Sequence, residues 1–223
     1  MASTPTCSER RLAVKVCGMR HPDNIAQVAA LGPDMMGFIF WPGSKRCARG
    51  LDPAAVRALP GEITRVGVFV DAEPEEIAAT VARYGLQMAQ LHGDETPGEC
   101  QALRQSGIRV AKAIGVAAQA DIDRAMEYQD CADLLLFDTK SAARGGTGVA
   151  YDRSLLARYT GHVPFLMSGG IAPGDEPSIL AMRHPRLLGV DLNSRFETAP
   201  GVKSIPPLLC FINNLRDLDY EPT

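Results

Sequence analysis

The chain has 223 residues, of which 46% are hydrophobic and 22% are charged, and its formal net charge at pH 7 is -3. A weakly acidic chain without a basic patch argues against a nucleic-acid partner. No apolar run approaches the roughly 18 residues that a membrane-spanning helix needs. The length suits a single α/β barrel, which usually takes about 200 to 250 residues, and no linker rich in Pro, Ser or Gly divides the chain.

The cysteine spacing and the polar amino terminus indicate in which cellular compartment the protein works. No two cysteines form a C-x-x-C pair, so we expect neither a disulfide framework nor a metal site. This usage fits a reducing cytoplasm, where we expect the protein to work. Residues 1–11 lack the apolar segment of a secretory signal. We expect them to form a flexible tail, and residues 12–223 to form one catalytic domain.

Short apolar runs recur along the chain at intervals of roughly 20 to 30 residues, which suits alternating strands and helices. Several runs are almost continuously apolar, as is typical of parallel strands that are covered on both faces. The eight predicted strands are residues 12–17, 35–40, 64–70, 86–91, 109–113, 134–137, 163–167 and 187–192.

Helix-start and helix-stop signals lie between these runs. Asp52 and Pro53 provide an N-cap and a first-turn proline. Thr96 and Glu99 have the spacing of a capping box, and Gly85 is placed to end a helix. The eight predicted helices are residues 22–31, 53–59, 74–84, 96–106, 117–128, 152–159, 175–182 and 202–215.

Eight strands that are each followed by a helix predict an α/β fold, the (β/α)8 TIM barrel. An open doubly wound sheet is the alternative, but such sheets usually have about five to seven strands. In a barrel, the loops that follow the strands build the functional site. These loops begin at Cys17, Trp41, Asp71, His92, Ile114, Asp138, Ser168 and Asn193.

Cys17 ends the first predicted strand. Lys15 lies two residues earlier and points to the same side of the strand, where its ammonium would favour the thiolate. A thiolate can act as a nucleophile or as a proton-abstracting base. The alternative is an inert, buried cysteine. We expect the other five to be such cysteines or surface thiols: Cys7, Cys47, Cys100, Cys131 and Cys210.

Asp138 follows the apolar strand 134–137. A carboxylate there is partly removed from water, so we expect a raised pKa for Asp138, which would suit a general acid. An N-cap or a turn-forming aspartate is the alternative. The expected position of Asp138 across the barrel mouth from Cys17 favours the acid role.

The four histidines differ in position. His92 follows the fourth strand, where it could orient a reacting group or simply be a packed polar residue. His21, His162 and His184 lie in or beside predicted loops, so we expect them at the surface.

Arg46 lies in the loop after the second strand. A guanidinium at this place could bind a carboxylate through two parallel hydrogen bonds. Lys45 and Arg49 share the loop and are alternatives for this role, and a solvated loop cation is the other interpretation.

Two loops have the composition of a phosphate site. Gly169 and Gly170 follow the seventh strand, and Asn193 and Ser194 follow the eighth. In barrels these two loops often bind phosphate through backbone amides, and glycine allows the backbone to approach a ligand closely. The glycine-rich turn 144–148, after the sixth strand, is a candidate lid.

Taken together, and in order over nearly the whole chain, these segments resemble the phosphoribosylanthranilate isomerase family of tryptophan biosynthesis. The matching segments are residues 15–18, 37–40, 44–46, 66–71, 90–94, 137–140, 145–148, 168–170, 189–194, 197 and 200–203.

The resemblance implies an Amadori rearrangement of N-(5-phosphoribosyl)anthranilate to 1-(2-carboxyphenylamino)-1-deoxyribulose 5-phosphate. By this resemblance, Asp138 is the general acid on the ring oxygen and Cys17 is the general base on ribose C2. Arg46 meets the anthranilate carboxylate. The resemblance implies no cofactor, a small-molecule phosphoribosyl substrate, and a monomer or homodimer. The remaining expected substrate-binding residues are His92, Gly169, Gly170, Asn193 and Ser194.

One position departs from the family pattern. Arg195 stands where many members have glycine. Losing the glycine could narrow this loop, or Arg195 could point outward or add a charge to the phosphate. Two alternative functions remain. Histidine-pathway phosphoribosyl isomerases of the same fold have an aspartate at the end of the first strand, so Cys17 argues against that pathway. A non-catalytic barrel that binds a phosphorylated ligand would not need both Cys17 and Asp138.

Overall fold

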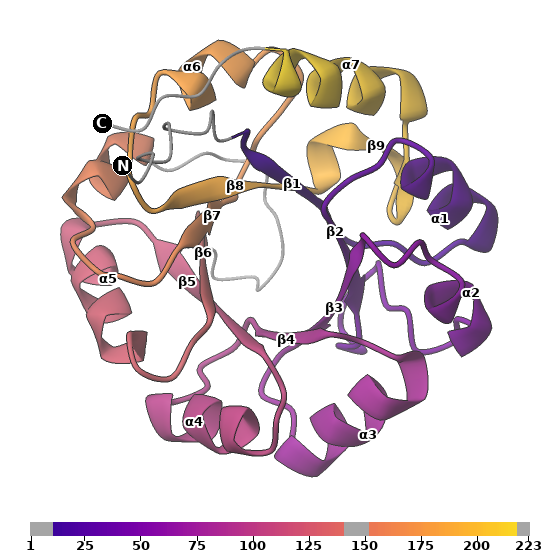
Figure 1. Ribbon diagram of the computed structural model, residues 1–223, viewed down its shortest axis with the longest axis horizontal. Coiled ribbons are helices and arrows are strands. Elements are labelled where there is room, and N and C mark those ends of the chain that lie inside the picture. The colour runs from indigo at the N-terminus through magenta and orange to yellow at the C-terminus, as the bar shows by residue number, and fades with distance from the viewer. Residues whose placement is uncertain (1–10, 141–151, 218–223) are drawn as a thin grey trace, which may run out of the picture.

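The computed structural model describes residues 11–140 and 152–217. Eight parallel strands form a closed barrel in the order β1 to β8, and β8 pairs with β1 (Figure 1). The predicted TIM barrel is therefore confirmed. The strands are β1 (Ala13–Val16), β2 (Met35–Ile39), β3 (Thr64–Phe69), β4 (Met88–Leu91), β5 (Val110–Val116), β6 (Leu134–Thr139), β7 (Phe165–Met167) and β8 (Leu187–Leu192).

Helices surround the barrel as an outer ring (Figure 1). The α-helices are α1 (Pro22–Ala29), α2 (Pro53–Arg57), α3 (Pro74–Tyr84), α4 (Pro97–Gln105), α5 (Gln119–Arg124), α6 (Glu176–Leu180) and α7 (Ile205–Arg216). The 3-10 helices are η1 (Ala125–Tyr128), η2 (Arg153–Arg158) and η3 (Ser194–Phe196). Thus residues 153–158 form a tighter helix than the predicted α-helix. No helix in the described ranges is long and apolar enough to cross a membrane.

Local signals set the helix ends as expected. The Asp52 carboxylate accepts a hydrogen bond from the backbone N–H of Ala54 at 2.9 Å, and Thr96 and Glu99 form a complete capping box. Gly85 ends α3 with φ 64, a left-handed conformation that glycine adopts without steric cost.

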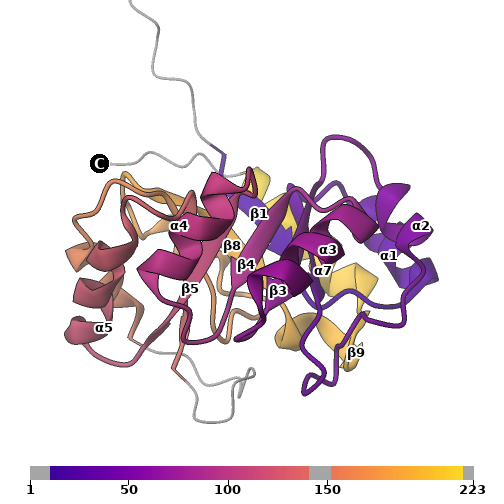
Figure 2. The same ribbon diagram turned by 90° about the horizontal axis from the view of Figure 1, so that it is seen from below.

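The predicted start of the last helix, at residue 202, is wrong. Residues Glu197–Ala199 (β9) and Val202–Lys203 (β10) form a two-stranded antiparallel ribbon, and α7 starts only afterwards. The backbone of Lys203 bonds to the side chain of Asn24 in both directions, at 2.7 and 3.0 Å. These bonds hold residue 203 in an extended conformation against α1. The ribbon β9–β10 lies at one end of the barrel (Figure 2).

Strand β5 is longer than predicted. It continues past residue 113 because its register with β6 extends to the pair Val116 and Thr139. Ile114 therefore lies within the strand and does not begin the loop.

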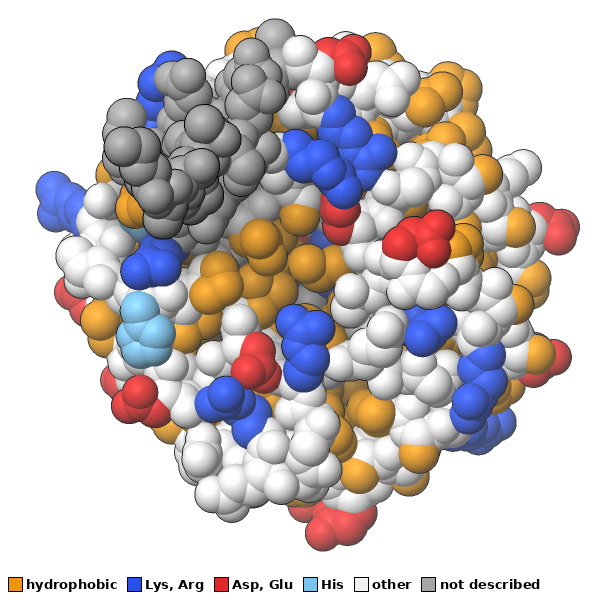
Figure 3. Space-filling view, viewed as in Figure 1, with side chains coloured by type: hydrophobic (Ala, Val, Ile, Leu, Met, Phe, Trp, Pro, Cys, Tyr) orange, Lys and Arg blue, Asp and Glu red, His pale blue; other side chains and the backbone are white. Residues whose placement is uncertain are grey.

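Alternation along the strands decides which side chains point into the barrel. Met88 of β4 and Leu134 and Leu136 of β6 point inward. They belong to a buried interior cluster with side chains of β3, β5 and β7. On the face shown in Figure 3, hydrophobic side chains fill the middle of the ring. The same alternation brings His92 and Asp138 to the carboxyl end of the barrel, where space for a ligand remains.

The amino end of the described chain is tied to the barrel. The Arg11 guanidinium forms an ion pair with Asp34 at 2.6 Å. Residues 1–10, which make up most of the predicted tail, lie outside the described residues.

Candidate functional site

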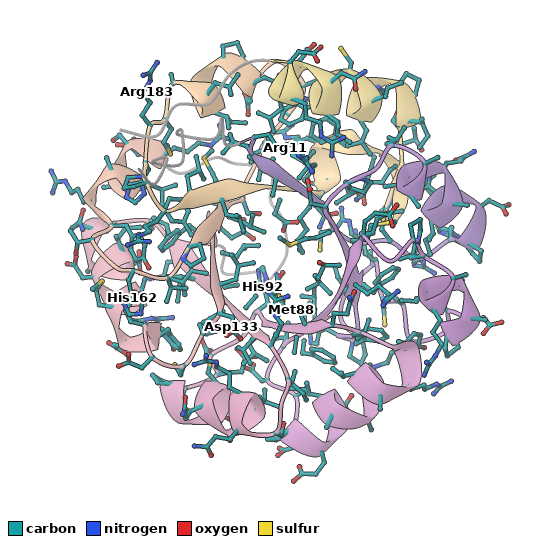
Figure 4. All side chains as sticks on the ribbon, viewed as in Figure 1. Arg11, Met88, His92, Asp133, His162 and Arg183 are labelled. Carbon is teal, nitrogen blue, oxygen red and sulfur yellow. The ribbon has the colours of Figure 1, made fainter. Side chains whose placement is uncertain are left out.

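A pocket of about 290 Å³ opens at the carboxyl ends of the strands. All eight residues that the sequence predicted for the site line it, although they come from the ends of six different strands and the loops that follow them. They are Cys17, Arg46, His92, Asp138, Gly169, Gly170, Asn193 and Ser194. His92 points into the ring of strands in Figure 4. The predicted lid, residues 144–148, lies outside the described residues.

Cys17 lies directly after β1 and is 3% exposed. Lys15 and Asp191 are register partners on β1 and β8, and the Lys15 ammonium bonds to the Asp191 carboxylate at 2.9 Å. A Cβ atom on Gly37 would come within 2.7 Å of the Cys17 sulfur and 3.2 Å of the Lys15 nitrogen. Gly37 therefore leaves the space in which the thiol and the ammonium lie together.

Burial is the strongest influence on Cys17 and raises the pKa of its thiol. Lys15 and Lys203 oppose this effect, and the carboxylate of Asp191 adds to it, so the pKa stays above its ordinary value. Lys15 therefore favours the thiolate as expected, but burial outweighs its effect in the protein without substrate. Asp191, which pairs with Lys15 at 2.9 Å, adds to the effect of burial.

Asp138, at the end of β6, has a dense set of hydrogen-bond donors. Its Oδ1 accepts from the backbone N–H of Thr139 at 2.8 Å, and its Oδ2 lies 3.3 Å from His92 Nε2. The Gln90 side-chain amide lies 2.8 Å from His92 Nδ1. With the Gln90 nitrogen as donor, Nδ1 is an acceptor, so the ring proton is on Nε2 and points at Asp138.

Burial raises the pKa of Asp138, but the donors outweigh it. His92, the Thr139 backbone and Ser168 together hold the pKa of Asp138 below its ordinary value. The expected raised pKa is therefore wrong for the protein without substrate. His92 is a partner of the carboxylate, and the sequence did not distinguish this from a role beside the thiol.

Arg46 is the loop cation that lines the pocket. Its Nε lies 2.9 and 3.0 Å from the two Glu197 carboxylate oxygens, and its Nη2 lies 2.7 Å from Oε2. Arg49 instead donates to the Phe40 carbonyl at 2.8 Å and pairs with Glu76. The structure therefore separates Arg46 from Arg49, and neither Lys45 nor Arg49 lines the pocket.

The two predicted phosphate loops follow β7 and β8. Gly169 and Gly170 have φ 87 and 66. A Cβ atom on Gly169 would lie 2.4 Å from Thr139 Oγ1 and 2.8 Å from its backbone nitrogen, so a larger residue does not fit. After β8, Asn193 leads into η3. Arg195 is exposed and does not line the pocket.

Further pocket residues lie within the strands and not in the loops that follow them. Gln90 and Asp191 lie two residues before His92 and Asn193, so strand alternation could have found them. Trp41, Ile39 and Val68 supply apolar wall to the same pocket.

The structure also corrects the expected surface position of His184. It is buried, and its Nε2 lies 2.9 Å from the Tyr159 carbonyl, while its Nδ1 accepts from the Arg186 backbone at 3.0 Å. His184 is therefore a packed residue outside the site.

Comparisons with known proteins agree on one family. The family described as N-(5'phosphoribosyl)anthranilate (PRA) isomerase matches residues 14–214. The N-(5'-phosphoribosyl)anthranilate isomerase of Parabacteroides distasonis is 42% identical over 207 residues, covering 92% of this chain and 93% of its own.

Two solved structures have the same fold. A phosphoribosyl anthranilate isomerase in complex with reduced 1-(o-carboxyphenylamino)-1-deoxyribulose 5-phosphate matches with a TM-score of 0.79 and 32% identity, covering 93% of this chain and 100% of its own. Monomers generated from the dimeric isomerase of Thermotoga maritima match with a TM-score of 0.78, the same identity and the same coverage of both chains.

Proposed function

The chain belongs to the family of N-(5'-phosphoribosyl)anthranilate isomerases, and on this premise we propose how its side chains divide the reaction. The protein catalyses the Amadori rearrangement of N-(5'-phosphoribosyl)anthranilate to 1-(2-carboxyphenylamino)-1-deoxyribulose 5-phosphate in tryptophan biosynthesis. The proposed roles rest on one observation: Cys17 and Asp138 line the same pocket from different strands. Cys17 lies beside the Lys15–Asp191 ion pair, whereas Asp138 contacts His92.

Asp138 is the general acid of the first step. It gives a proton to the furanose ring oxygen while the anthranilate nitrogen lone pair forms the C1=N bond and the C1–O bond breaks. The product of this step is an open-chain iminium ion. His92 and the Thr139 backbone hold the Asp138 carboxyl in the orientation that this transfer needs.

Cys17 is the general base of the second step. Its thiolate takes the proton from ribose C2, and the C–H electron pair forms the C1=C2 bond of an enolamine while the iminium nitrogen becomes neutral. Protonation at C1 and loss of the C2 hydroxyl proton then give the ketone. The positive charge of the iminium ion favours the thiolate beside it.

The proton balance requires that substrate binding changes the site. Without substrate, burial raises the pKa of the Cys17 thiol, and the hydrogen-bond donors lower the pKa of the Asp138 carboxyl. Both shifts reduce the fraction of molecules that holds the thiolate together with the protonated acid. Substrate that displaces water from Asp138 would raise the pKa of this carboxyl and increase that fraction.

We expect kcat/KM to be nearly independent of pH between pH 7 and 8.5, above the second ionisation of the substrate phosphate at about 6. In the resting form the proton is on Cys17, and in the reactive form it is on Asp138. Both forms carry one proton on this pair, so their ratio does not change with pH in the range between the two pKa values. Below the pKa of Asp138 both groups are protonated and the base is missing. Above the pKa of Cys17 both are ionised and the acid is missing. Initial rates at low substrate concentration measure this profile, and a tenfold rise per pH unit would contradict it.

The substrate occupies the pocket in one orientation. Arg46 meets the anthranilate carboxylate, and the apolar wall beside it, which includes Trp41, receives the aromatic ring. The phosphate lies at the loops that follow β7 and β8, at Gly169, Gly170, Asn193 and Ser194, with the ribose between Cys17 and Asp138.

Replacing Arg46 with alanine is expected to raise KM by about tenfold to hundredfold, because a charge-assisted hydrogen bond is lost. We expect kcat to change much less, since the carboxylate keeps its charge throughout the reaction. Steady-state kinetics measures both constants. The matched control is Arg49→Ala in the same loop, which should leave KM unchanged, and an unchanged KM in Arg46→Ala would remove the proposed contact.

A base role for Cys17 requires a reduced thiol, which supports the cytoplasm as its compartment. The reaction needs only proton transfers, so the proposal includes no cofactor. We propose a monomer or a homodimer.

The decay of substrate fluorescence on addition of the purified protein tests the function. An accelerated decay with formation of the deoxyribulose product is the expected result. Binding of the reduced product analogue without any acceleration would indicate a binding protein instead.

A further inference from the structure

We propose that Glu197 is a positioning residue that orients Arg46 toward the substrate carboxylate, an inference that rests on the proposed function. Neither the sequence nor the reaction chemistry assigns a role to the ribbon β9–β10. The ribbon nevertheless provides the closest partner of Arg46. Glu197 would thus determine how strongly the site selects a ligand that carries an aryl carboxylate.

The Arg46 guanidinium has two edges that can bind a carboxylate in parallel. Glu197 occupies the Nε–Nη2 edge with contacts of 2.7 to 3.0 Å. Among the described residues, none accepts a hydrogen bond from Nη1, so the second edge remains available. Because Arg46 lines the pocket, a ligand carboxylate can use this edge.

Glu197 is itself held rigidly. Its Oε1 accepts from the Lys203 ammonium at 2.7 Å and from the Gly201 backbone at 3.1 Å. Its side chain is 5% exposed and that of Lys203 is fully buried. Lys203 also donates to the Asn193 side chain at 2.8 Å. The carboxylate that orients Arg46 is therefore fixed by the ribbon and by the loop after β8.

Backbone packing near Cys17 adds to this constraint. A Cβ atom on Gly18 would lie 2.7 Å from Arg46 Cδ and 2.8 Å from Asn193 Oδ1. The stem of Arg46 thus lies against the backbone that follows the catalytic base.

A positioning role and a purely electrostatic role of Glu197 predict opposite effects of its removal on binding of the ligand carboxylate. Arg46, Lys203 and Glu197 together carry one net positive charge. If the ligand carboxylate were attracted by charge alone, removing the charge of Glu197 would strengthen its binding. If Glu197 orients Arg46, the same change weakens binding despite the added positive charge.

The test compares two ligands in several variants. One ligand is reduced 1-(o-carboxyphenylamino)-1-deoxyribulose 5-phosphate, and the other is the same compound without the carboxylate. The measured quantity is the ratio of their dissociation constants, obtained by titration calorimetry. We expect Glu197→Gln to reduce the preference for the carboxylate by about tenfold or more, approaching the value of Arg46→Ala.

Three further variants complete the test. The double variant Arg46→Ala with Glu197→Gln should lose no more preference than Arg46→Ala, because both act on one contact. Glu197→Asp retains the charge but withdraws the carboxylate, so it should also reduce the preference, and it serves if Glu197→Gln does not fold. Thr198→Ala, an exposed position in the same ribbon, should keep the wild-type ratio.

An unchanged or increased preference in Glu197→Gln, or an unchanged preference in Glu197→Asp, would overturn the positioning role. The two levels of failure are distinguishable. If Arg46→Ala reduces the preference and both Glu197 variants do not, only this inference fails. If Arg46→Ala itself has the wild-type ratio, the proposed carboxylate contact fails and the role of Glu197 fails with it.

Discussion

Replacing Cys17 with alanine is expected to lower kcat by about 10² to 10⁴-fold while the protein remains folded. The loss has the size of a missing general base. Lys15 and Asp191 stay paired with each other at 2.9 Å, so the variant leaves no unpaired buried charge. We expect KM to change little, because the proposed phosphate and carboxylate contacts remain. The fluorescence decay of the substrate gives both constants.

Two controls define the Cys17 result. Cys17→Ser is nearly isosteric but has a hydroxyl that is far less acidic than a thiol, so it should lose as much activity as Cys17→Ala. Cys210→Ala changes an exposed cysteine on α7 and should be fully active. Near-wild-type kcat in Cys17→Ala would show that another group removes the proton.

Replacing Asp138 with asparagine is expected to lower kcat by a comparable factor, about 10² to 10⁴-fold. An amide can still accept the hydrogen bond from the Thr139 backbone that Asp138 accepts at 2.8 Å. It cannot transfer a proton to the ring oxygen, and its NH2 group would face the proton on His92 Nε2. Ring opening would then depend on water. Steady-state rates and a thermal unfolding curve separate the catalytic effect from any loss of stability.

Asp133→Asn is the matched control for Asp138. Asp133 lies just before β6, at the opposite end of the same strand, and accepts a hydrogen bond from the Val110 backbone at 2.8 Å. We expect a small loss of stability and a nearly unchanged kcat. If Asp138→Asn retained more than about a tenth of wild-type kcat, the general-acid role would be wrong, because that loss is below the range of such catalysis.

The fold was predictable because its signals are local. Short apolar runs, helical patterns, first-turn prolines and glycine stops identified every barrel strand and most of the helices. The ribbon β9–β10 was missed because its extended conformation depends on Asn24, about 180 residues away, through its bonds to the Lys203 backbone. Such a long-range contact has no local signal in residues 197–203.

The sequence predicted which residues at the strand ends form the candidate site, but not the ion pairs and hydrogen bonds between them. The position of each strand end located Cys17, His92 and Asp138, and barrel closure brought them into one pocket. The ion pair of Lys15 with Asp191 depends on the register between β1 and β8, and a shift of one residue would turn Asp191 to the other face. The donors that lower the pKa of Asp138 were likewise invisible, whereas its burial was evident.

A substrate that carries deuterium at ribose C2 tests the division of labour between Cys17 and Asp138 most directly. Without the base, breaking the C2–H bond limits the rate, so the residual activity of Cys17→Ala should show a full primary isotope effect. Without the acid, ring opening limits the rate, so Asp138→Asn should show an isotope effect close to one. The opposite pattern, with the large effect in Asp138→Asn and none in Cys17→Ala, would contradict the assignment of Cys17 as base and Asp138 as acid.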